Sequence, residues 1–355
     1  MDFFTDAQTM DFFAELDAAG TMDAFSFRED HNVPEASDQA TLITPESREA
    51  ATPVGTPMSE APPPLQLPTP PQPLYSVSAS FHSKFHCKNL GPDAIFITTD
   101  RVIFYAHTSV LLIASQNAFN GLLSVEAIER GREITAGPLL IVTVPANSTL
   151  FNVVFHTIYG ISCTQYSPSL DILLEAVTEL RTYGVSQDKF ISPDKPIFHH
   201  ILSETPRNPI NVFLVASEND LEPLAVATSV HLHSLHLPSI TDEMVNRMGP
   251  KYFKRLVNLH IERTEYLKQI LLDPPTPHVD TVDCGFIQRR SLARAWAFAT
   301  ASLVWDIRPD LPAGVLRSTL GSLEQKLGCS ECKANLAARV RQIVLDWTTR
   351  AKSTI

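Results

Sequence analysis

The sequence predicts an α+β protein: a short β-sheet covered by α-helices, followed by an all-helical C-terminal region and preceded by a disordered tail. Three observations support this. Two β-branched and aromatic runs flank a polar turn between residues 94 and 105. Helical apolar spacing follows, broken by one further strand-like run. Beyond residue 196, only helical patterns recur.

The first two strands and the first helix follow one another closely. Ala94–Ile97 and Val102–Tyr105 are joined by the polar residues 98–101, which predicts a hairpin. A helix is then expected over Ser109–Leu123. Its proposed buried face consists of Leu111, Leu112, Ser115, Phe119, Leu122 and Leu123.

One more strand and two helices complete this mixed region. The apolar run Leu139–Val144 predicts a buried strand that Pro145 stops. Asn147 is a suitable N-cap for a helix that Gly160 ends. A second helix is expected to begin at Ser167-Pro168 and to close at Gly184.

The rest of the chain has the spacing of amphipathic helices, the clearest of which begins at Pro250. A proline-rich linker, Asp273–Asp283, divides this part. The other predicted helices centre on Leu224–His236, Ser291–Trp305, Leu316–Leu327 and Asn335–Trp347. We therefore expect a tail at 1–73, a mixed region at 74–192 and a helical region at 193–355.

The negative charge of the chain lies in its tail. Residues 1–80 contain 13 acidic and 2 basic side chains, of 39 and 28 in the whole chain, so the remainder has 26 of each. A neutral folded part without a basic cluster argues against a nucleic-acid-binding face, because phosphate contacts need Lys and Arg. We expect no direct nucleic-acid partner.

The tail combines proline, acidic and aromatic residues in a way typical of disordered segments. The motif MDFF occurs at Met1–Phe4 and again at Met10–Phe13. Acidic neighbours keep such Phe side chains solvated and available to a partner groove. The predicted partner-binding residues are Phe3, Phe4, Phe12, Phe13 and Phe25. The alternatives are a plain solvated tail and a segment that docks back onto its own chain.

An odd, sparse set of five cysteines suggests a reducing compartment. The N-terminus lacks the features of a signal peptide, and no apolar stretch approaches the roughly 18 residues that span a bilayer. We therefore expect a soluble intracellular protein without a membrane partner, in the nucleus or the cytoplasm.

Cys329 and Cys332 form one C-x-x-C motif in a helical context. A zinc site would need two more ligands, for which Cys284, His278 or the histidines His231, His233 and His236 are available. A single C-x-x-C is a weak signal, so the sequence predicts no metal and no cofactor, with Cys329, Cys332 and Cys284 as the candidates if there is one. Motifs of hydrolases, nucleotide-binding enzymes and metalloproteases are absent from the sequence, which predicts a non-enzyme.

The order of elements between Phe81 and about Phe190 resembles a BTB/POZ domain. The matching positions are Asp93, the Ala106-His107 pair, Leu111, Leu112, Ser115, Phe119, the Phe151…Ile158-Tyr159-Gly160 pattern and the Leu173–Gly184 helix. The likeness is to the divergent BTB proteins of mushroom-type fungi, which carry a helical C-terminal part. It implies an interaction module in which His107 packs at a strand-to-helix junction.

The resemblance also implies partners. BTB domains commonly form homodimers through an N-terminal strand and the first helix, which here correspond to about Leu74–Phe85. We expect a scaffold or transcriptional co-regulator that binds proteins such as transcription machinery; the alternative is a substrate adaptor of a cullin-type ubiquitin ligase. Two departures from the family pattern argue against cullin binding and against a co-repressor pocket. Ser124 and Ala127 replace the large apolar residue of the cullin motif, and Thr108 stands where co-repressor-binding BTB domains have Arg.

Overall fold

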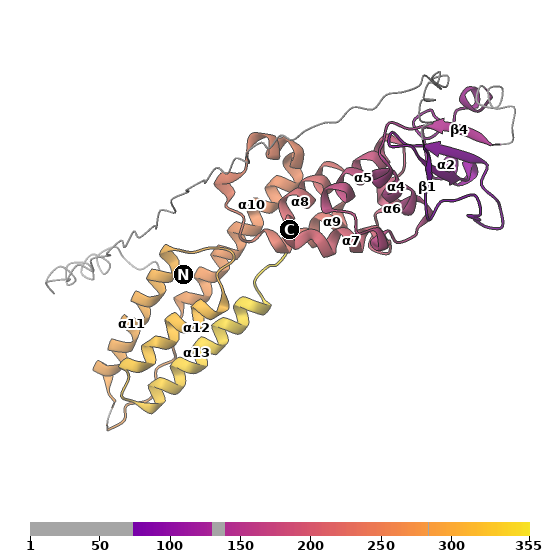
Figure 1. The fold of residues 1–355 in the computed structure, drawn as a ribbon. Helices are drawn as coiled ribbons and strands as arrows, with labels where there is room; N and C mark the ends of the chain where they lie inside the picture. The colour runs from indigo at the N-terminus through magenta and orange to yellow at the C-terminus, as the bar shows by residue number, and fades with distance from the viewer. Residues whose placement is uncertain (1–73, 130–138, 283) are drawn as a thin grey trace, which may run out of the picture. The chain divides into compact units, whose positions relative to one another are not determined.

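The computed structural model describes residues 74–129, 139–282 and 284–355 (Figure 1). The predicted tail and its Phe residues lie outside the described residues. The described residues belong to one compact unit. Its described part is a mixed α+β fold with one four-stranded sheet and a majority of helix, as the sequence predicts.

The strands are β1 (Ser76–Val77), β2 (Ala94–Ile97), β3 (Val102–Ala106) and β4 (Leu140–Thr143), arranged in the order β1-β3-β2-β4. β2 and β3 form the predicted antiparallel hairpin, with Phe96 opposite Phe104. β4 lies parallel to β2, and β1 lies parallel to β3 at the edge of the sheet. The hairpin and the third predicted strand are therefore confirmed.

The hairpin turn is fastened to the helix that covers it. Arg101 adopts a left-handed φ of 62°, which lets the chain reverse between β2 and β3. The Asp100 carboxylate accepts hydrogen bonds from the Ser148 N–H (2.9 Å), the Ser148 hydroxyl and the Thr98 hydroxyl. Because Ser148 is the first residue of α4 (Ser148–Tyr159), this contact also places a negative charge at a helix N-terminus.

The first helix is shorter than predicted. α2 (Thr108–Ala114) ends nine residues before Leu123, and 116–123 fold as bends and turns with left-handed φ angles at Ala118, Phe119 and Asn120. The Ser115 hydroxyl accepts the Phe119 N–H (2.7 Å) and donates to a backbone carbonyl outside the helix. A serine that bonds the backbone in this way competes with helix continuation. Leu112, placed on the buried face by the helical pattern, is exposed.

The next two helices follow the sequence signals closely. Asn147 caps α4 by accepting the Leu150 N–H, and Gly160 ends it with a φ of 68°. α5 (Leu170–Thr182) is capped by Ser169, not by Ser167 as predicted, because a short 3-10 turn precedes it. Gly184 then takes a φ of 68°, in the left-handed region that favours glycine.

Phe155 of α4 lies among the aromatic rings that fill the space between sheet and helices. Its ring centroid is 4.3 Å from that of Phe151, and 5.3–5.8 Å from those of Phe81, Phe96 and Phe104. Phe119 stacks on Tyr183 of the chain segment after α5, at 4.2 Å. All of these side chains are fully or almost fully buried.

The apolar core continues past residue 192, the expected end of the mixed region, and runs to Leu256. The helices that extend it are α6 (Gln187–Phe190), α7 (Pro196–Glu204), α8 (Pro209–Glu218), α9 (Glu222–Ser229) and α10 (Asp242–Leu272). Gly249 has non-helical angles inside α10, so Pro250 begins its second segment as predicted. The helix expected over Leu224–His236 ends at Ser229 and continues only as 3-10 turns.

A second apolar cluster joins the end of α10 to three further helices. These are α11 (Phe286–Trp305), α12 (Ala313–Gly321) and α13 (Ser330–Thr349). Short 3-10 segments lie at Thr164–Tyr166, Thr205–Arg207, Val230–Leu232, Leu237–Ser239 and Ser322–Lys326. Of the helices that the structure describes, none has the length and apolar character needed to cross a bilayer.

Candidate metal centre

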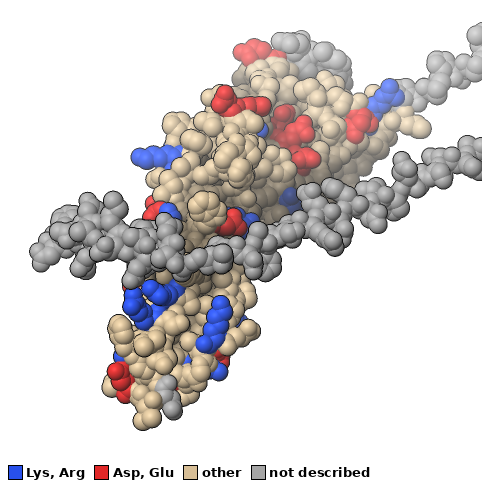
Figure 2. All heavy atoms as spheres, turned by 90° about the vertical axis from the view of Figure 1, so that its left-hand side faces the viewer, with Lys and Arg blue, Asp and Glu red and all other residues tan. Residues whose placement is uncertain are grey.

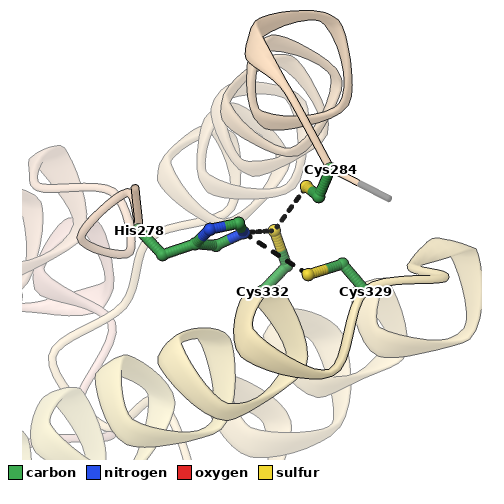
Figure 3. A group of neighbouring side chains, drawn as sticks. All are labelled: His278, Cys284, Cys329 and Cys332. Atoms are coloured by element: carbon green, nitrogen blue, oxygen red, sulfur yellow. Dashed lines mark hydrogen bonds between the residues drawn. The ribbon is translucent and has the colours of Figure 1, made fainter. Parts of the chain in front are cut away.

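Four sulfur and nitrogen ligands converge where the linker after α10 meets the start of α13 (Figure 3). His278 and Cys284 come from the linker. Cys329 is the N-cap of α13, and Cys332 lies in its first turn. We call these four residues the Cys₃His cluster. Their potential ligand atoms all lie within 4.8 Å of one another.

The shortest separations in the Cys₃His cluster involve its central thiol. The Cys332 Sγ is 3.2 Å from the His278 Nε2 and 3.7 Å from the Cys284 Sγ. The Cys329 Sγ lies 3.4 Å from the same His278 Nε2. In a tetrahedral zinc site with the usual bond lengths, sulfur–sulfur edges measure about 3.8 Å and nitrogen–sulfur edges about 3.6 Å. The three separations are thus close to those of a zinc site. The most widely spaced ligand atoms, up to 4.8 Å apart, would have to approach one another by about 1 Å.

The cluster is shielded from water on one side. Cys284 and Cys332 are buried, whereas His278 and Cys329 are partly buried. Leu292 of α11 is buried together with the two thiols, and Leu327 packs against them. Low polarity around a group of thiols strengthens any bond to a cation and limits exchange with solvent.

Hydrogen bonds fix the orientation of the imidazole. The His278 Nδ1 donates to the Val279 carbonyl at 2.6 Å, and the Glu331 carboxylate lies 3.3 Å from the same nitrogen. Because a carbonyl only accepts, Nδ1 carries a proton, and Nε2 is the nitrogen that faces the thiols. A ligating histidine held by its other nitrogen is the usual arrangement around bound metals.

The linker is fastened at both ends. Pro274, Pro275 and Pro277 prevent the chain from continuing α10, so the following residues are irregular. Arg289 of α11 donates to the His278 carbonyl, and Asn335 of α13 donates to the Thr276 carbonyl at 2.9 Å. These contacts position His278 without any contribution from the thiols, and backbone hydrogen bonds to Thr281 hold Cys284.

The thiols have unequal acidities. Backbone N–H groups of Cys332 and Glu331 at the α13 N-terminus lower the pKa of Cys329 to about 7. Burial raises the pKa of Cys332 to about 12 and also raises that of Cys284. The hydrogen bond to the Val279 carbonyl raises the pKa of His278. Without a cation the cluster therefore holds one readily formed thiolate beside two protonated thiols.

Among the alternatives that the sequence left open, only His278 joins the cysteines. His231, His233 and His236 lie on the 3-10 turns after α9, where the His233 Nε2 bonds the Ser353 carbonyl at 2.8 Å. Cys284 and His278 precede the C-x-x-C by more than 40 residues, so no local spacing identifies them. Two signals in the sequence could have indicated a metal site here. They are the prolines of the linker and the position of Cys329 at the N-cap of a helix.

The BTB-like positions lie around the hairpin and α2. His107 is buried where β3 meets α2, and its ring bonds the Tyr159 hydroxyl (3.1 Å) and the Leu90 carbonyl (3.0 Å), the packing role expected of it. Asp93 accepts hydrogen bonds from the Thr108 N–H (2.7 Å) and hydroxyl at the start of α2. Ala106, Leu111 and Phe119 are buried in the aromatic core.

One other cysteine–histidine pair lies within the described residues. The Cys163 Sγ is 3.7 Å from the His200 Nδ1. Burial raises the pKa of Cys163, whereas a catalytic cysteine needs a lowered pKa to supply thiolate. The pair therefore lacks the electrostatics of an activated nucleophile.

In comparisons with models of known protein families, with curated proteins and with solved structures, nothing matches this chain. Its function is therefore argued from its own residues. Two features carry that argument: the Cys₃His cluster and the apolar side chains that the folded unit leaves exposed.

Proposed function

We propose that this chain is a protein–protein interaction scaffold. It self-associates through a BTB/POZ-like domain at residues 74–192 and binds a second protein through the outer face of α11. The observation that carries the proposal is that α11 has two apolar faces but buries only one.

The buried face of α11 consists of Leu292, Trp296 and Leu303. On the opposite face, Ile287, Phe298 and Trp305 are 79%, 63% and 94% exposed. These three positions are 11 and 7 residues apart, so at about 100° per residue they form one stripe along the helix. A helix that is apolar on all sides is normally buried on all sides. Several large exposed apolar side chains on one face of a helix are typical of a binding surface.

The charge around this stripe suggests the chemistry of its partner. Arg290 and Arg294 are exposed on α11, which contains no acidic residue. Residues 286–355 contain 11 basic and 5 acidic side chains. Figure 2 shows Lys and Arg gathered on the lower part of the molecule, where α11–α13 lie. Two copies of α11 placed face to face would bring like charges together, so we assign the stripe to a different protein with apolar and acidic side chains.

A groove of 590 Å³ lies beside the stripe, between α10 and α11. Its lining is mainly apolar and includes Leu272, Pro274, Ala297, Ala301 and Val304. A groove of this kind accepts the apolar face of an amphipathic helix. The stripe and the groove together would form one surface for such a partner helix.

Self-association is assigned to the sheet edge. In the described part of the chain, β1 pairs only with β3, so its outer edge has free backbone donors and acceptors. Val77 on this strand and the preceding Leu74 and Tyr75 are each more than half exposed. An exposed apolar edge strand readily pairs with a second copy. We propose a homodimer formed there, in keeping with the resemblance to BTB domains.

The test compares three full-length proteins purified from the native cell. The first is wild type. The second, the stripe variant, combines Ile287→Ser, Phe298→Ser and Trp305→Ser. The third is a control with Ile261→Ser and Leu345→Ser, which removes apolar side chains that are also about half exposed but lie on α10 and α13. Co-purified proteins are measured by quantitative mass spectrometry, and the mass of the purified chain by light scattering.

We expect a stoichiometric partner with wild type and control that is lost with the stripe variant, while all three chains have the mass of a dimer. Transcription machinery among the partners would support the co-regulator form of the proposal, whereas a cullin would support the ligase-adaptor form. The same partners in all three samples, or the mass of a monomer for wild type, would contradict the corresponding half of the proposal.

A further inference from the structure

We propose that the Cys₃His cluster binds one Zn²⁺ ion and that this ion is structural. The inference is independent of the interaction function proposed above. It assigns a metal site to four residues of which the sequence motif indicates only two.

The donor set of the cluster suits zinc. Three sulfur ligands and one imidazole nitrogen favour zinc over the hard cations Mg²⁺ and Ca²⁺, which prefer oxygen. Combinations of three Cys and one His are among the usual structural zinc sites. Zinc imposes no redox chemistry, so such a site needs only ligands at the correct distances.

The four ligands already lie close enough together to surround one ion. The Nε2 of His278 faces Cys329 and Cys332 at 3.4 and 3.2 Å, and the hydrogen bond from Nδ1 to the Val279 carbonyl holds the ring in this orientation. Figure 3 shows the three sulfur atoms and the imidazole directed toward a common centre. Their approach to one another is closer than apolar packing of the thiols requires and is near that of the ligands of one ion.

The number of protein ligands indicates a structural role for the ion. Four protein ligands fill a tetrahedral zinc site and leave no position for water or substrate, which distinguishes structural from catalytic zinc. Here the ligands join the linker after α10 to the first turn of α13. Gly285, which follows the ligand Cys284, is the N-cap of α11. One zinc ion would therefore fix the beginnings of α11 and α13 relative to the end of α10.

The experiment measures metal in the full-length protein, purified without chelator and without an affinity tag that binds metal. Elemental analysis should find about one zinc per chain, and Cys284→Ser or Cys332→Ser should reduce this to a small fraction. The matched controls are Cys87→Ser and His236→Asn, which change the same residue types outside the cluster. Both controls should keep the zinc of wild type.

A second measurement guards against variants that fail to fold. Wild-type protein is stripped of metal and titrated with Co²⁺, whose absorption spectrum reports geometry and thiolate ligation. We expect the intense visible bands of tetrahedral Co²⁺ and thiolate-to-metal charge transfer, both abolished by one equivalent of Zn²⁺. The stripe variant should behave like wild type, which separates failure of this inference from failure of the proposed function.

Three results would overturn the proposal. One is wild-type protein with no zinc and no tetrahedral cobalt spectrum. Another is intact-mass and thiol counting that show a disulfide among Cys284, Cys329 and Cys332 in freshly prepared protein. The third is equal zinc loss in the Cys87→Ser control, which would place the metal elsewhere.

Discussion

The sheet-containing part of this protein and its three C-terminal helices are stabilised in different ways. Around the sheet, one continuous core contains a group of packed Phe rings and extends from Phe81 to Leu256. The C-terminal helices enclose a smaller cluster of Leu, Val, Ile and Trp side chains. Beside it lies the Cys₃His cluster, with Leu292 as its main apolar neighbour.

The difference shows how a helical region with a small core can hold its shape. A region that buries little apolar surface gains little from the hydrophobic effect, and small domains often rely on metals or disulfides for that reason. α11 is an example of such limited burial, because one of its two apolar faces is exposed to solvent. We infer that the proposed zinc ion compensates for the apolar surface that α11 leaves exposed to solvent.

The largest expected effect follows from removing that ion. A strong chelator should abolish slow hydrogen exchange in α11–α13 while the amides of β2, β3 and α4 keep theirs, because only the C-terminal helices depend on the cluster. Hydrogen–deuterium exchange with mass spectrometry measures both parts in one sample. Addition of Zn²⁺ should restore the protection. Equal loss in both parts, or no loss in either, would remove the proposed distinction between them.

A smaller but still large effect is expected from Phe155→Ala in the aromatic core. Phe155 is fully buried and contacts several other rings, so truncation leaves a cavity that costs about 3–5 kcal/mol of stability. Urea unfolding followed by circular dichroism gives the change in the free energy of unfolding.

Two further measurements on this variant test the comparison. The zinc content of folded Phe155→Ala should equal that of wild type, because the aromatic core and the cluster do not share side chains. The matched control Phe298→Ala removes an exposed ring and should change the stability by less than about 0.5 kcal/mol. A similar loss in both variants would mean that ring packing around Phe155 is not what stabilises the sheet.

Local signals in the sequence were sufficient for the hairpin, for β4 and for α4. Asn147 and Gly160 occupy positions whose backbone requirements are set by the helix itself. The end of α2 could not be predicted in this way, because Ser115 is held by the distant Tyr183 carbonyl. Apolar periodicity continued through 116–123 and indicated a helix that the tertiary contacts prevent.

The Cys₃His cluster was only partly predictable for a related reason. Cys329 and Cys332 form a recognisable motif, but the fold alone brings His278 and Cys284 to them. Similarly, the helical pattern identifies α11 without showing which of its apolar faces is buried. The assembly of the cluster and the choice of the buried face of α11 both depend on packing partners that are distant in sequence. The pattern of a single sequence does not identify these partners.

The smallest expected effect is an acid sensitivity specific to the sheet-containing part. His156 of α4 is fully buried against Phe81, and its Nε2 has no hydrogen-bond partner among the described residues. Burial lowers the pKa of His156 below its ordinary value of about 6.5. The unfolded chain therefore binds a proton first as the pH falls, and the protein loses stability as the pH falls from about 7 toward the lowered pKa of His156.

His156→Leu removes this titration while keeping a similar volume, so α4 should lose less hydrogen-exchange protection between pH 7 and pH 5 than in wild type. Exchange rates are corrected for the intrinsic effect of pH and compared at α4 alone, because burial also lowers the pKa of His233 and His260, outside the sheet and α4. The control His260→Leu should leave the acid response of α4 unchanged. If α4 in His156→Leu weakened with acid as much as in wild type, the buried histidine would not be the cause of the acid response, and another titrating group would have to be responsible for it.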